Sequence, residues 1–309
     1  MSVVTAACMT CGASGPVHEA DASDYVTGEA FRVYRCPGCD VAFTWPRPAS
    51  MDAYYPARYR RYAGPVAALL RALYTVRVRR WTRGRPPGRA LEVGCGAGWM
   101  LHALARQGWD AIGLERTSEQ ATIASRELGV PVLVGGVERL PELGAFDLIF
   151  LFHVLEHLDD PATALRACAA HLKPGGRLIV AVPNYASWQA RYARGGWFHL
   201  DVPRHLYHFT PAALARLLRE AGLRPAGVRF ASWEHDPYGW VQSVENRVGL
   251  SPNALTRTLM GLTPPPPGRV LALALAALLT LPAAVLSVVS WLAGAGAIME
   301  MSAVRGERT

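Results

Sequence analysis

The sequence feature that most constrains the fold is the run LEVGCGAG at Leu91–Gly98. An apolar, strand-like stretch leads into three glycines in G-x-G-x-G spacing, and helical periodicity begins near Trp99. Glycine reaches left-handed backbone conformations and lets a ligand lie against the main chain, so the run predicts a strand, a ligand-binding turn and a helix. Trp99 stands where the dinucleotide fingerprint G-x-G-x-x-G needs its third glycine. The run therefore favours a nucleotide-like ligand other than a dinucleotide.

Short apolar runs alternate with segments of helical periodicity from Arg89 onward. Near-continuous apolar strands separated by amphipathic helices predict an α/β fold with a parallel sheet covered on both faces. A helix opened by Thr210-Pro211 and a strand near Gly227–Ser232 follow. We expect earlier strands at Ala90–Val93, Ala111–Glu115, Val130–Val134, Phe146–Phe152 and Arg177–Val182, and helices at Ala97–Gln107, Ser118–Leu128 and Ala162–Leu172.

Several segments resemble motifs of class I S-adenosylmethionine-dependent methyltransferases, in particular the bacterial methyltransferase-23-like family with an N-terminal zinc ribbon. The G-x-G-x-G turn resembles their first motif, and Glu115 ends the next strand where a carboxylate can accept both ribose hydroxyls. GVERLP at Gly136–Pro141 resembles the adenine-side motif, with Val137 or Glu138 in place of the usual Asp. FDLIFLFHVLEHLDDP and LKPGGRLIVAVPN resemble the motifs of the fourth and fifth strands.

This resemblance covers roughly Arg89 to Gly222. It implies a Rossmann-like, seven-stranded methyltransferase sheet, bound S-adenosylmethionine and methyl transfer from that cofactor. The matching positions are the expected cofactor-binding residues: Glu92, Gly94, Cys95, Gly96, Gly98, Glu115, Val137, Glu138, Phe152 and His153.

Four of the six cysteines form two C-x-x-C pairs, Cys8 with Cys11 and Cys36 with Cys39. Two such pairs supply four thiolates for a tetrahedral structural zinc with no open position. A redox role is disfavoured, because a redox C-x-x-C is normally single and stands at a helix start. We therefore predict a zinc ribbon over residues 1–48.

Candidate catalytic residues gather in two places. His153 and His157 lie in HVLEH after the fourth predicted strand, and His199 and His205 lie in the aromatic-rich loop Gly195–Thr210. Methyl transfer needs an aligned acceptor and, for a hydroxyl or enol, a base. Three interpretations of HVLEH stay open: packing against the cofactor loop, a general base, or a second divalent metal near Glu156 and His157. The metal rests on a resemblance to the ExxEH motif of metal-dependent O-methyltransferases, from which His153 departs.

The formal net charge is +8, and Lys173 is the only lysine. No acidic residue stands between Asp52 and Glu92, where arginines recur from Arg58 onward. Within this stretch, Pro65–Trp81 is predicted to be an amphipathic helix because its apolar residues have helical spacing: Val66, Leu69, Leu70, Leu73 and Val76. The N-terminus shows no secretory signal pattern, and the cysteine pairs suit a reducing compartment, so we expect a cytoplasmic protein.

An uncharged run at Val270–Met299 is long enough for a transmembrane helix. The resemblance implies an antiparallel seventh strand, best placed at Ala297–Arg305, which a single crossing would leave on the far side of the bilayer. Breaks at Pro282 and at Gly294/Gly296 therefore predict an apolar helical hairpin over 262–296 in the membrane interface. The alternatives are burial within the protein or a dimer interface. We expect a basic helical linker at 49–88 and a methyltransferase domain at 89–309 containing this C-terminal apolar insertion.

The expected methyl acceptor is an oxygen or carbon of a lipid-like or membrane-associated small molecule, with the protein peripheral on the inner face of the membrane. One alternative is an RNA methyltransferase that grips nucleic acid through the ribbon and the arginines. Another is an enzyme for a soluble sugar or polyketide. The apolar run discriminates, because an RNA enzyme does not need it. The sequence does not indicate the oligomeric state.

Overall fold

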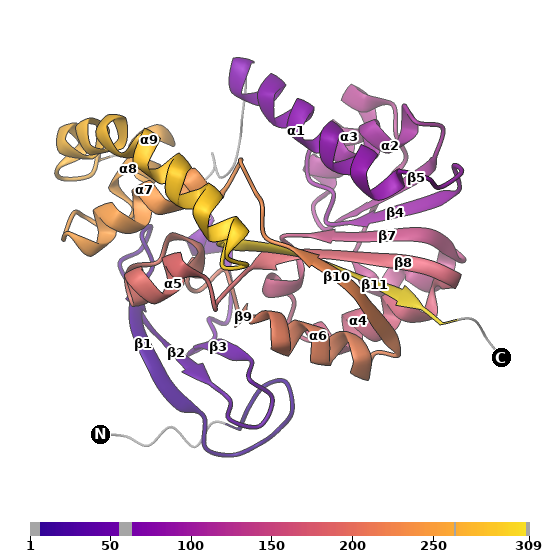
Figure 1. The fold of residues 1–309 in the computed structure, drawn as a ribbon, viewed down its shortest axis with the longest axis horizontal. Coiled ribbons are helices and arrows are strands. Elements are labelled where there is room, and N and C mark those ends of the chain that lie inside the picture. Colours follow the sequence, from indigo (N-terminus) through magenta and orange to yellow (C-terminus); the bar gives the residue numbers. More distant parts are fainter. Residues whose placement is uncertain (1–6, 56–63, 263, 307–309) are drawn as a thin grey trace. The chain divides into compact units, whose positions relative to one another are not determined.

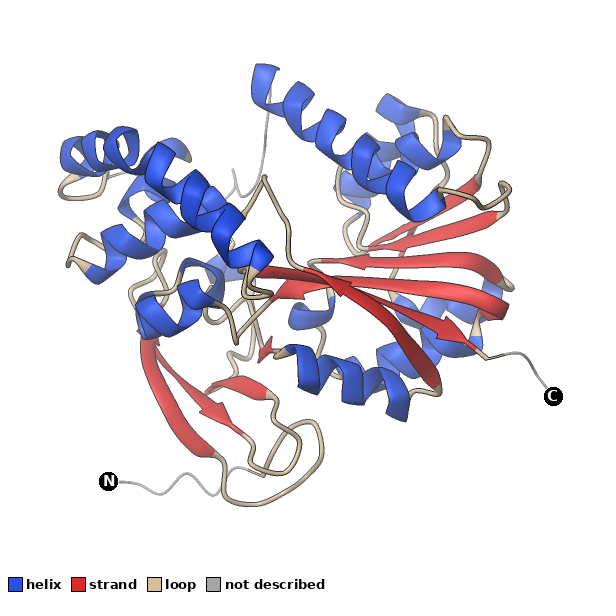
Figure 2. Ribbon diagram, in the orientation of Figure 1, coloured by secondary structure: helices blue, strands red, loops and turns tan. Residues whose placement is uncertain are grey.

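The computed structural model describes residues 7–55, 64–262 and 264–306. The chain divides into two compact units, whose elements are drawn in Figures 1 and 2. The first unit comprises Met1–Arg61, Pro183–Leu214 and Arg229–Met299, and the second comprises Tyr62–Val182, Ala215–Val228 and Glu300–Thr309. The boundaries predicted at 48 and 88 remain predictions, and Arg58 lies outside the described residues.

The second unit is built on a seven-stranded sheet in the order β10-β11-β8-β7-β4-β5-β6 (Figure 1). β4 to β8 are parallel. β11 runs antiparallel to β8, because the start of β11 lies at the end of β8 and its end lies at the start of β8. At the first place the Ala297 carbonyl accepts the Asn184 N–H, and at the second Arg305 donates to the Ala170 carbonyl. This confirms the predicted methyltransferase sheet. The strands are β4 Arg89–Val93, β5 Asp110–Glu115, β6 Val132–Val134, β7 Phe146–Phe152, β8 Leu172–Pro183, β10 Leu223–Arg229 and β11 Ile298–Arg305.

The connection order reverses between β4 and β7, which lie side by side with Val93 opposite Leu151. Ligands of open α/β sheets bind at such a reversal, outside the carboxyl ends of the strands. The turn after β4 and the turn after β7 therefore form the expected ligand edge.

Helices cover both faces of this sheet, with α1, α2 and α3 on one face and α4 on the other (Figure 1). β7 and α3 match their predicted bounds, whereas β8 begins earlier and β10 ends earlier than expected. α2 begins after Gly98 because a φ of 69° there is left-handed and cannot belong to an α-helix. The helices and 3-10 turns are α1 Gly64–Thr82, α2 Trp99–Ala105, α3 Ser118–Leu128, η2 Val137–Glu142, η3 Leu155–His157, α4 Pro161–Ala170 and α6 Pro211–Glu220, which begins in the first unit.

The helix predicted at Pro65–Trp81 forms as α1. Leu69 is 61% exposed and Val76 is exposed, whereas Arg77 and Trp81 are buried. Arg77 Nε donates to Glu300 Oε1 at 2.6 Å, and Trp81 Nε1 donates to Glu300 Oε2 at 3.0 Å. The buried ion pair with β11 sets the inward face of the helix.

Replacing Glu300 with glutamine is expected to destabilise the protein by about 3 kcal/mol, because it leaves the buried Arg77 guanidinium without its counter-charge. Chemical denaturation measures the change. Glu220→Gln, which breaks the exposed pair of Glu220 with Arg216 on α6, is the control and should change stability by less than about 1 kcal/mol. Wild-type stability in the Glu300 variant would contradict a structural role for the buried pair.

The first unit contains a four-stranded sheet in the order β1-β2-β3-β9. Phe31 and Val33 of β2 share a core with Ala190, Trp197 and Val202, so the strand before the second cysteine pair packs against the segment that contains the histidine-rich loop. The strands are β1 Val17–Ser23, β2 Ala30–Arg35, β3 Ala42–Trp45 and β9 Tyr207–His208, and 3-10 turns lie at η1 Asp52–Tyr54, η4 Arg194–Gly196 and η5 Phe198–Leu200.

Four helices complete the first unit, of which only the last lies in a segment predicted to be helical. Ser187 caps α5 by accepting the Ala190 N–H, and Pro237 stands in the first turn of α7, so both starts carry recognisable signals. The helices are α5 Trp188–Ala193, α7 Asp236–Arg247, α8 Ala254–Leu259 and α9 Arg269–Leu292.

The hairpin predicted over 262–296 is wrong, because α9 is one continuous helix with Pro282 inside it. An internal proline removes one hydrogen bond and costs about 3 kcal/mol. Packing of Ala272, Ala276 and Ala283 against the α7–α8 region extends on both sides of Pro282 and offsets that cost. Gly294, with a φ of 68°, follows the helix as its left-handed end and does not divide it.

Candidate cofactor and active site

The glycine-rich turn after β4 has the geometry that its sequence predicts. Gly94, Gly96 and Gly98 have φ values of 68°, 51° and 69°, all left-handed. A Cβ on Gly94 would lie 2.4 Å from the Val154 side chain, so the turn packs directly on the segment after β7. A Cβ on Gly96 would meet no atom within 4 Å, so this part of the main chain is open to a ligand.

The carboxylate of Glu115 at the end of β5 is held against this open turn. Its Oε2 accepts the Gly96 N–H at 2.9 Å, and its Oε1 accepts the Thr117 N–H at 3.3 Å. A carboxylate has about four acceptor positions. Glu115 therefore keeps the capacity to accept ligand hydroxyls beside Gly96.

Glu92 is the second carboxylate of the turn, and it is buried. Burial raises its pKa well above the usual range, and the neighbouring Glu115 raises it further. Its Oε2 finds no hydrogen-bond partner among the residues that the structure describes. Cys95 is also buried, and burial raises the pKa of its thiol, so it acts as an apolar wall. An unsatisfied buried carboxylate behind an open glycine turn fits a polar ligand such as S-adenosylmethionine.

The turn after β7 places an imidazole beside a buried carboxylate. His153 directly follows Phe152 and adopts a φ of 53°. Its Nδ1 lies 3.4 Å from Oε1 of Glu156, which is almost fully buried, whereas His153 is one-tenth exposed. A carboxylate this close to the ring favours the imidazolium form of a histidine. The arrangement can therefore take up a proton at the other ring nitrogen.

The remaining predicted residues of this unit lie on two turns. His157 is half-buried on η3, where its N–H donates to the Val154 carbonyl. Glu138 is exposed on η2 and its Oε1 accepts the Gly136 N–H at 2.6 Å, while Val137 is half-buried. The roles of Val137 and Glu138 in adenine binding, the catalytic role of His157, and the divalent metal near Glu156 and His157 remain predictions.

Residues 59–226, more than half of the chain, match the methyltransferase-23 family, which is described as a methyltransferase domain. The chain belongs to the S-adenosylmethionine-dependent methyltransferases. The ubiquinone biosynthesis O-methyltransferase of Xanthomonas axonopodis pv. citri (strain 306) is 34% identical over 170 residues, 50% of this chain and 71% of that protein. The enzyme of the same description from Bordetella avium (strain 197N) is 34% identical over 182 residues, 55% of this chain and 75% of that protein.

The solved structure of the cyclase SpnF shows the same fold as this methyltransferase. The match covers 80% of this chain and 85% of that chain, with 22% identity and a TM-score of 0.51. The comparison supports the architecture, and the activity rests on the family match.

The methyltransferase carries its four-cysteine cluster in the first unit. The Sγ atoms of Cys8, Cys11, Cys36 and Cys39 all lie within 4.8 Å of one another. Cys8 and Cys39 are 3.6 Å apart, as are Cys11 and Cys36. Tetrahedral zinc with bonds of about 2.3 Å places its sulfur ligands about 3.8 Å apart. Burial raises the thiol pKa of Cys8 and Cys39, so four thiolates at this distance need a cation, and the cluster can hold zinc.

The predicted loop histidines of the methyltransferase are buried in the first unit. Nδ1 of His205 lies 2.8 Å from the His199 carbonyl, and Nε2 of His208 lies 2.9 Å from Thr44 Oγ1. Burial lowers the pKa of His208 to about 3, so it stays neutral. Arg204 is also buried and reaches Asp24 and Asp201 at 2.8 Å each. These buried contacts hold the polar side chains of the loop in place. Catalytic roles of His199 and His205 remain predictions.

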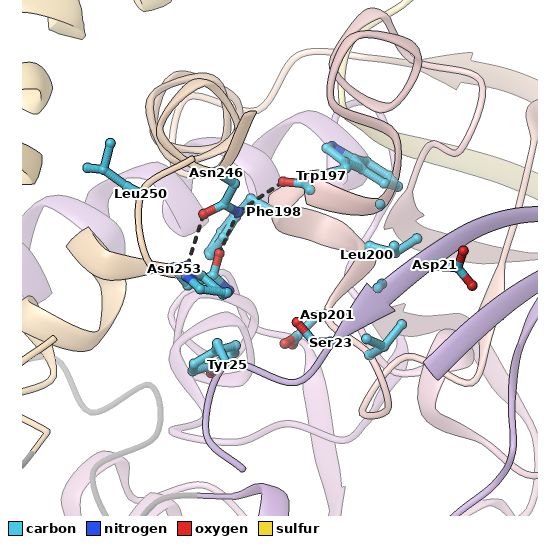
Figure 3. A pocket seen from close by; sticks show the side chains of 15 residues that line it. Asp21, Ser23, Tyr25, Trp197, Phe198, Leu200, Asp201, Asn246, Leu250 and Asn253 are labelled. Atoms are coloured by element: carbon cyan, nitrogen blue, oxygen red, sulfur yellow. Dashed lines mark hydrogen bonds between the residues drawn. The ribbon is translucent and has the colours of Figure 1, made fainter. Parts of the chain in front are cut away.

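Part of the same loop lines a cavity of about 380 Å³ within the first unit. Figure 3 shows Trp197, Phe198 and Leu200 beside Asn246 and Asn253. Asn246 Nδ2 donates to the Gly196 carbonyl at 2.9 Å and to Asn253 Oδ1 at 2.8 Å, which fixes the wall of the cavity. Sequence reasoning missed Asn246 and Asn253, because neither stands in a recognisable motif.

Proposed function

We propose that the enzyme transfers the methyl group of S-adenosylmethionine to a hydroxyl of a lipid-like, catechol-type quinone precursor. The single observation that carries this proposal is the glycine turn with Glu115 after β4 beside the His153–Glu156 pair after β7. The names of the ubiquinone biosynthesis relatives support an oxygen acceptor of this class. The sheet edge thus combines a cofactor cradle with a candidate base.

The cofactor, when bound, supplies an electrophilic methyl group on a sulfonium. Gly94–Gly98 would hold its methionine and ribose parts, Glu115 would accept the ribose hydroxyls, and Val137 and Glu138 would flank the adenine. His153 would take the proton of the acceptor hydroxyl when that oxygen receives the methyl group, and the cofactor's sulfur would leave as a neutral thioether. Buried Glu156 positions the imidazole and stabilises its protonated form.

The four-cysteine cluster is proposed to bind one structural zinc, which would leave no open coordination position for catalysis. The proposed compartment is the cytoplasm, with the enzyme peripheral on the inner face of the membrane where a lipid-like acceptor is reached.

The test incubates the purified full chain with methyl-labelled S-adenosylmethionine and, separately, a polyprenylated catechol in detergent, a soluble sugar and RNA. Label is expected in the catechol. His153→Ala is expected to lower kcat about 100-fold or more and to remove the acidic limb of the pH–rate profile. His171→Ala is the matched control, because His171 is a half-buried histidine at the C-terminal end of α4. Label in RNA or sugar alone, or wild-type kcat for His153→Ala, would overturn the proposal.

A further inference from the structure

Helix α9 presents its large apolar side chains to solvent and its small ones to the protein. Ala272, Ala283, Ser287 and Ser290 are buried. Leu278, Leu281 and Leu292 are 71%, 74% and 85% exposed, and Val270, Val285 and Val289 are also exposed. Burial of the small side chains lets α9 lie close to α7. The exposed large side chains remain largely in water, so they contribute little hydrophobic stabilisation to the fold.

The exposed side chains form one long stripe. Leu278, Leu281, Val285, Val289 and Leu292 recur every three or four residues, so they share one helix face. Mean hydropathy in the most apolar window of α9 reaches 2.4, and 17% of that window is buried. Monomeric soluble proteins rarely expose a continuous apolar face of this kind.

The segment of the first unit that contains α9, residues 229–299, exposes arginine side chains and no carboxylate side chain among its described residues. Residues 229–299 contain three carboxylates, and Glu234, Asp236 and Glu245 all have buried side chains. Arg247 and Arg269 are exposed. An apolar stripe in a segment with exposed arginines and no exposed carboxylates matches the interface of an anionic lipid leaflet.

The C-terminal end of α9 is held within the first unit, which directs the helix along a surface. Beyond its C-terminal end, the Ala295 and Ala297 carbonyls accept the N–H groups of Trp188 and Asn184. Trp291 Nε1 donates to buried Asp236, and the ring of Trp291 lies 4.6 Å from that of exposed Trp233. Indole pairs of this kind are favoured at the boundary between lipid and water. A membrane crossing would instead draw the hydrogen-bonded polar side chains of α7, such as Gln242 and Asn246, into lipid.

We propose that the exposed face of α9 is a docking surface that lies flat in the headgroup region of an anionic bilayer, with Arg247 and Arg269 at the phosphates. This proposal rests on the proposed function in one respect, because a lipid-like acceptor gives the enzyme a reason to bind a membrane. Docking requires neither cofactor nor acceptor, so its failure can be told apart from failure of methyl transfer.

The test is co-sedimentation of the full chain with vesicles of phosphatidylcholine alone or with a third of phosphatidylglycerol, without cofactor or acceptor. Wild type is expected to bind the anionic vesicles more strongly. The double substitution Leu278→Asp and Leu281→Asp should weaken binding at least tenfold, and Arg247→Glu with Arg269→Glu should remove the preference for anionic lipid. Circular dichroism and cofactor affinity report whether each variant is folded.

Val17→Asp is the matched control, because Val17 is an exposed apolar residue on β1 in the same unit. It should bind vesicles like wild type. Equal binding by the Leu278/Leu281 variant would overturn the proposal. A wild-type dimer in light scattering that this variant converts to a monomer, without vesicle binding by wild type, would assign the face to a second copy and overturn it as well.

Discussion

Gly96→Val is expected to abolish measurable binding of S-adenosylmethionine, a loss of at least a thousandfold. Gly96 has a φ of 51° and open space where its Cβ would stand. A valine there would strain the left-handed backbone and fill the space in which the ligand meets the main chain. Isothermal titration calorimetry measures the affinity.

Gly222→Val separates the effect of backbone strain from the effect of filling the space for the ligand. Gly222 also has a left-handed φ, 79°, and open space around its Cβ position, but it stands in the turn between α6 and β10. This variant should lose similar stability and keep wild-type affinity. Glu115→Ala should weaken binding about a hundredfold, or about 2.7 kcal/mol, because the ribose acceptor and the Gly96 contact are lost together. Wild-type affinity in both the Gly96 and Glu115 variants would overturn the cofactor site.

Cys36→Ser is expected to remove the single zinc of each chain and to unfold the cysteine-bearing part of the first unit. Four-thiolate zinc sites contribute about 10–16 kcal/mol of binding free energy that folding depends on. Cys36 is buried with Sγ 3.6 Å from Cys11, so a serine oxygen would replace one ligand of a closed site. Elemental analysis gives the zinc content, and thermal denaturation gives the stability.

Cys168→Ala is the matched control, because Cys168 is buried in α4 and lies outside the four-cysteine cluster. It should keep one zinc per chain and lose only a modest packing contribution. A chelator added to wild type should reproduce the Cys36→Ser melting curve. Absence of zinc from freshly purified wild type, or its retention by Cys36→Ser, would contradict a structural zinc site.

Local patterns were enough to predict the cofactor turn, the cysteine cluster and most of the sheet. Gly94–Gly98 is recognisable because its left-handed φ values need glycine, whatever packs around it. The strands from β4 to β8 are near-continuous apolar runs, which a sheet covered on both faces requires. β11 was predicted correctly from the family sheet, although it follows a long apolar helix.

The faces that helices bury were harder to predict, because they depend on distant partners. The spacing of Leu69 and Val76 predicted a helix at α1 and did not show which of its faces is buried. Glu300, far along the chain, bonds Arg77 and Trp81 and holds them inside. The prolines and glycines near α9 suggested a hairpin, but packing along α7 kept one helix. The residue pattern of a segment shows which side chains could be buried, and the segments that pack against it determine which of them are buried.

The glycine run, Glu115 and the two C-x-x-C pairs are therefore what the sequence by itself determined, because backbone conformation and ligand chemistry at these positions depend on residue type and short spacing. Only the tertiary structure decided that the Glu156 carboxylate lies beside the His153 ring, that the loop histidines are buried, and that the leucines of α9 are exposed. Each of these depends on which surface a distant segment covers. That is settled by the balance of buried area and paired charge over the whole unit.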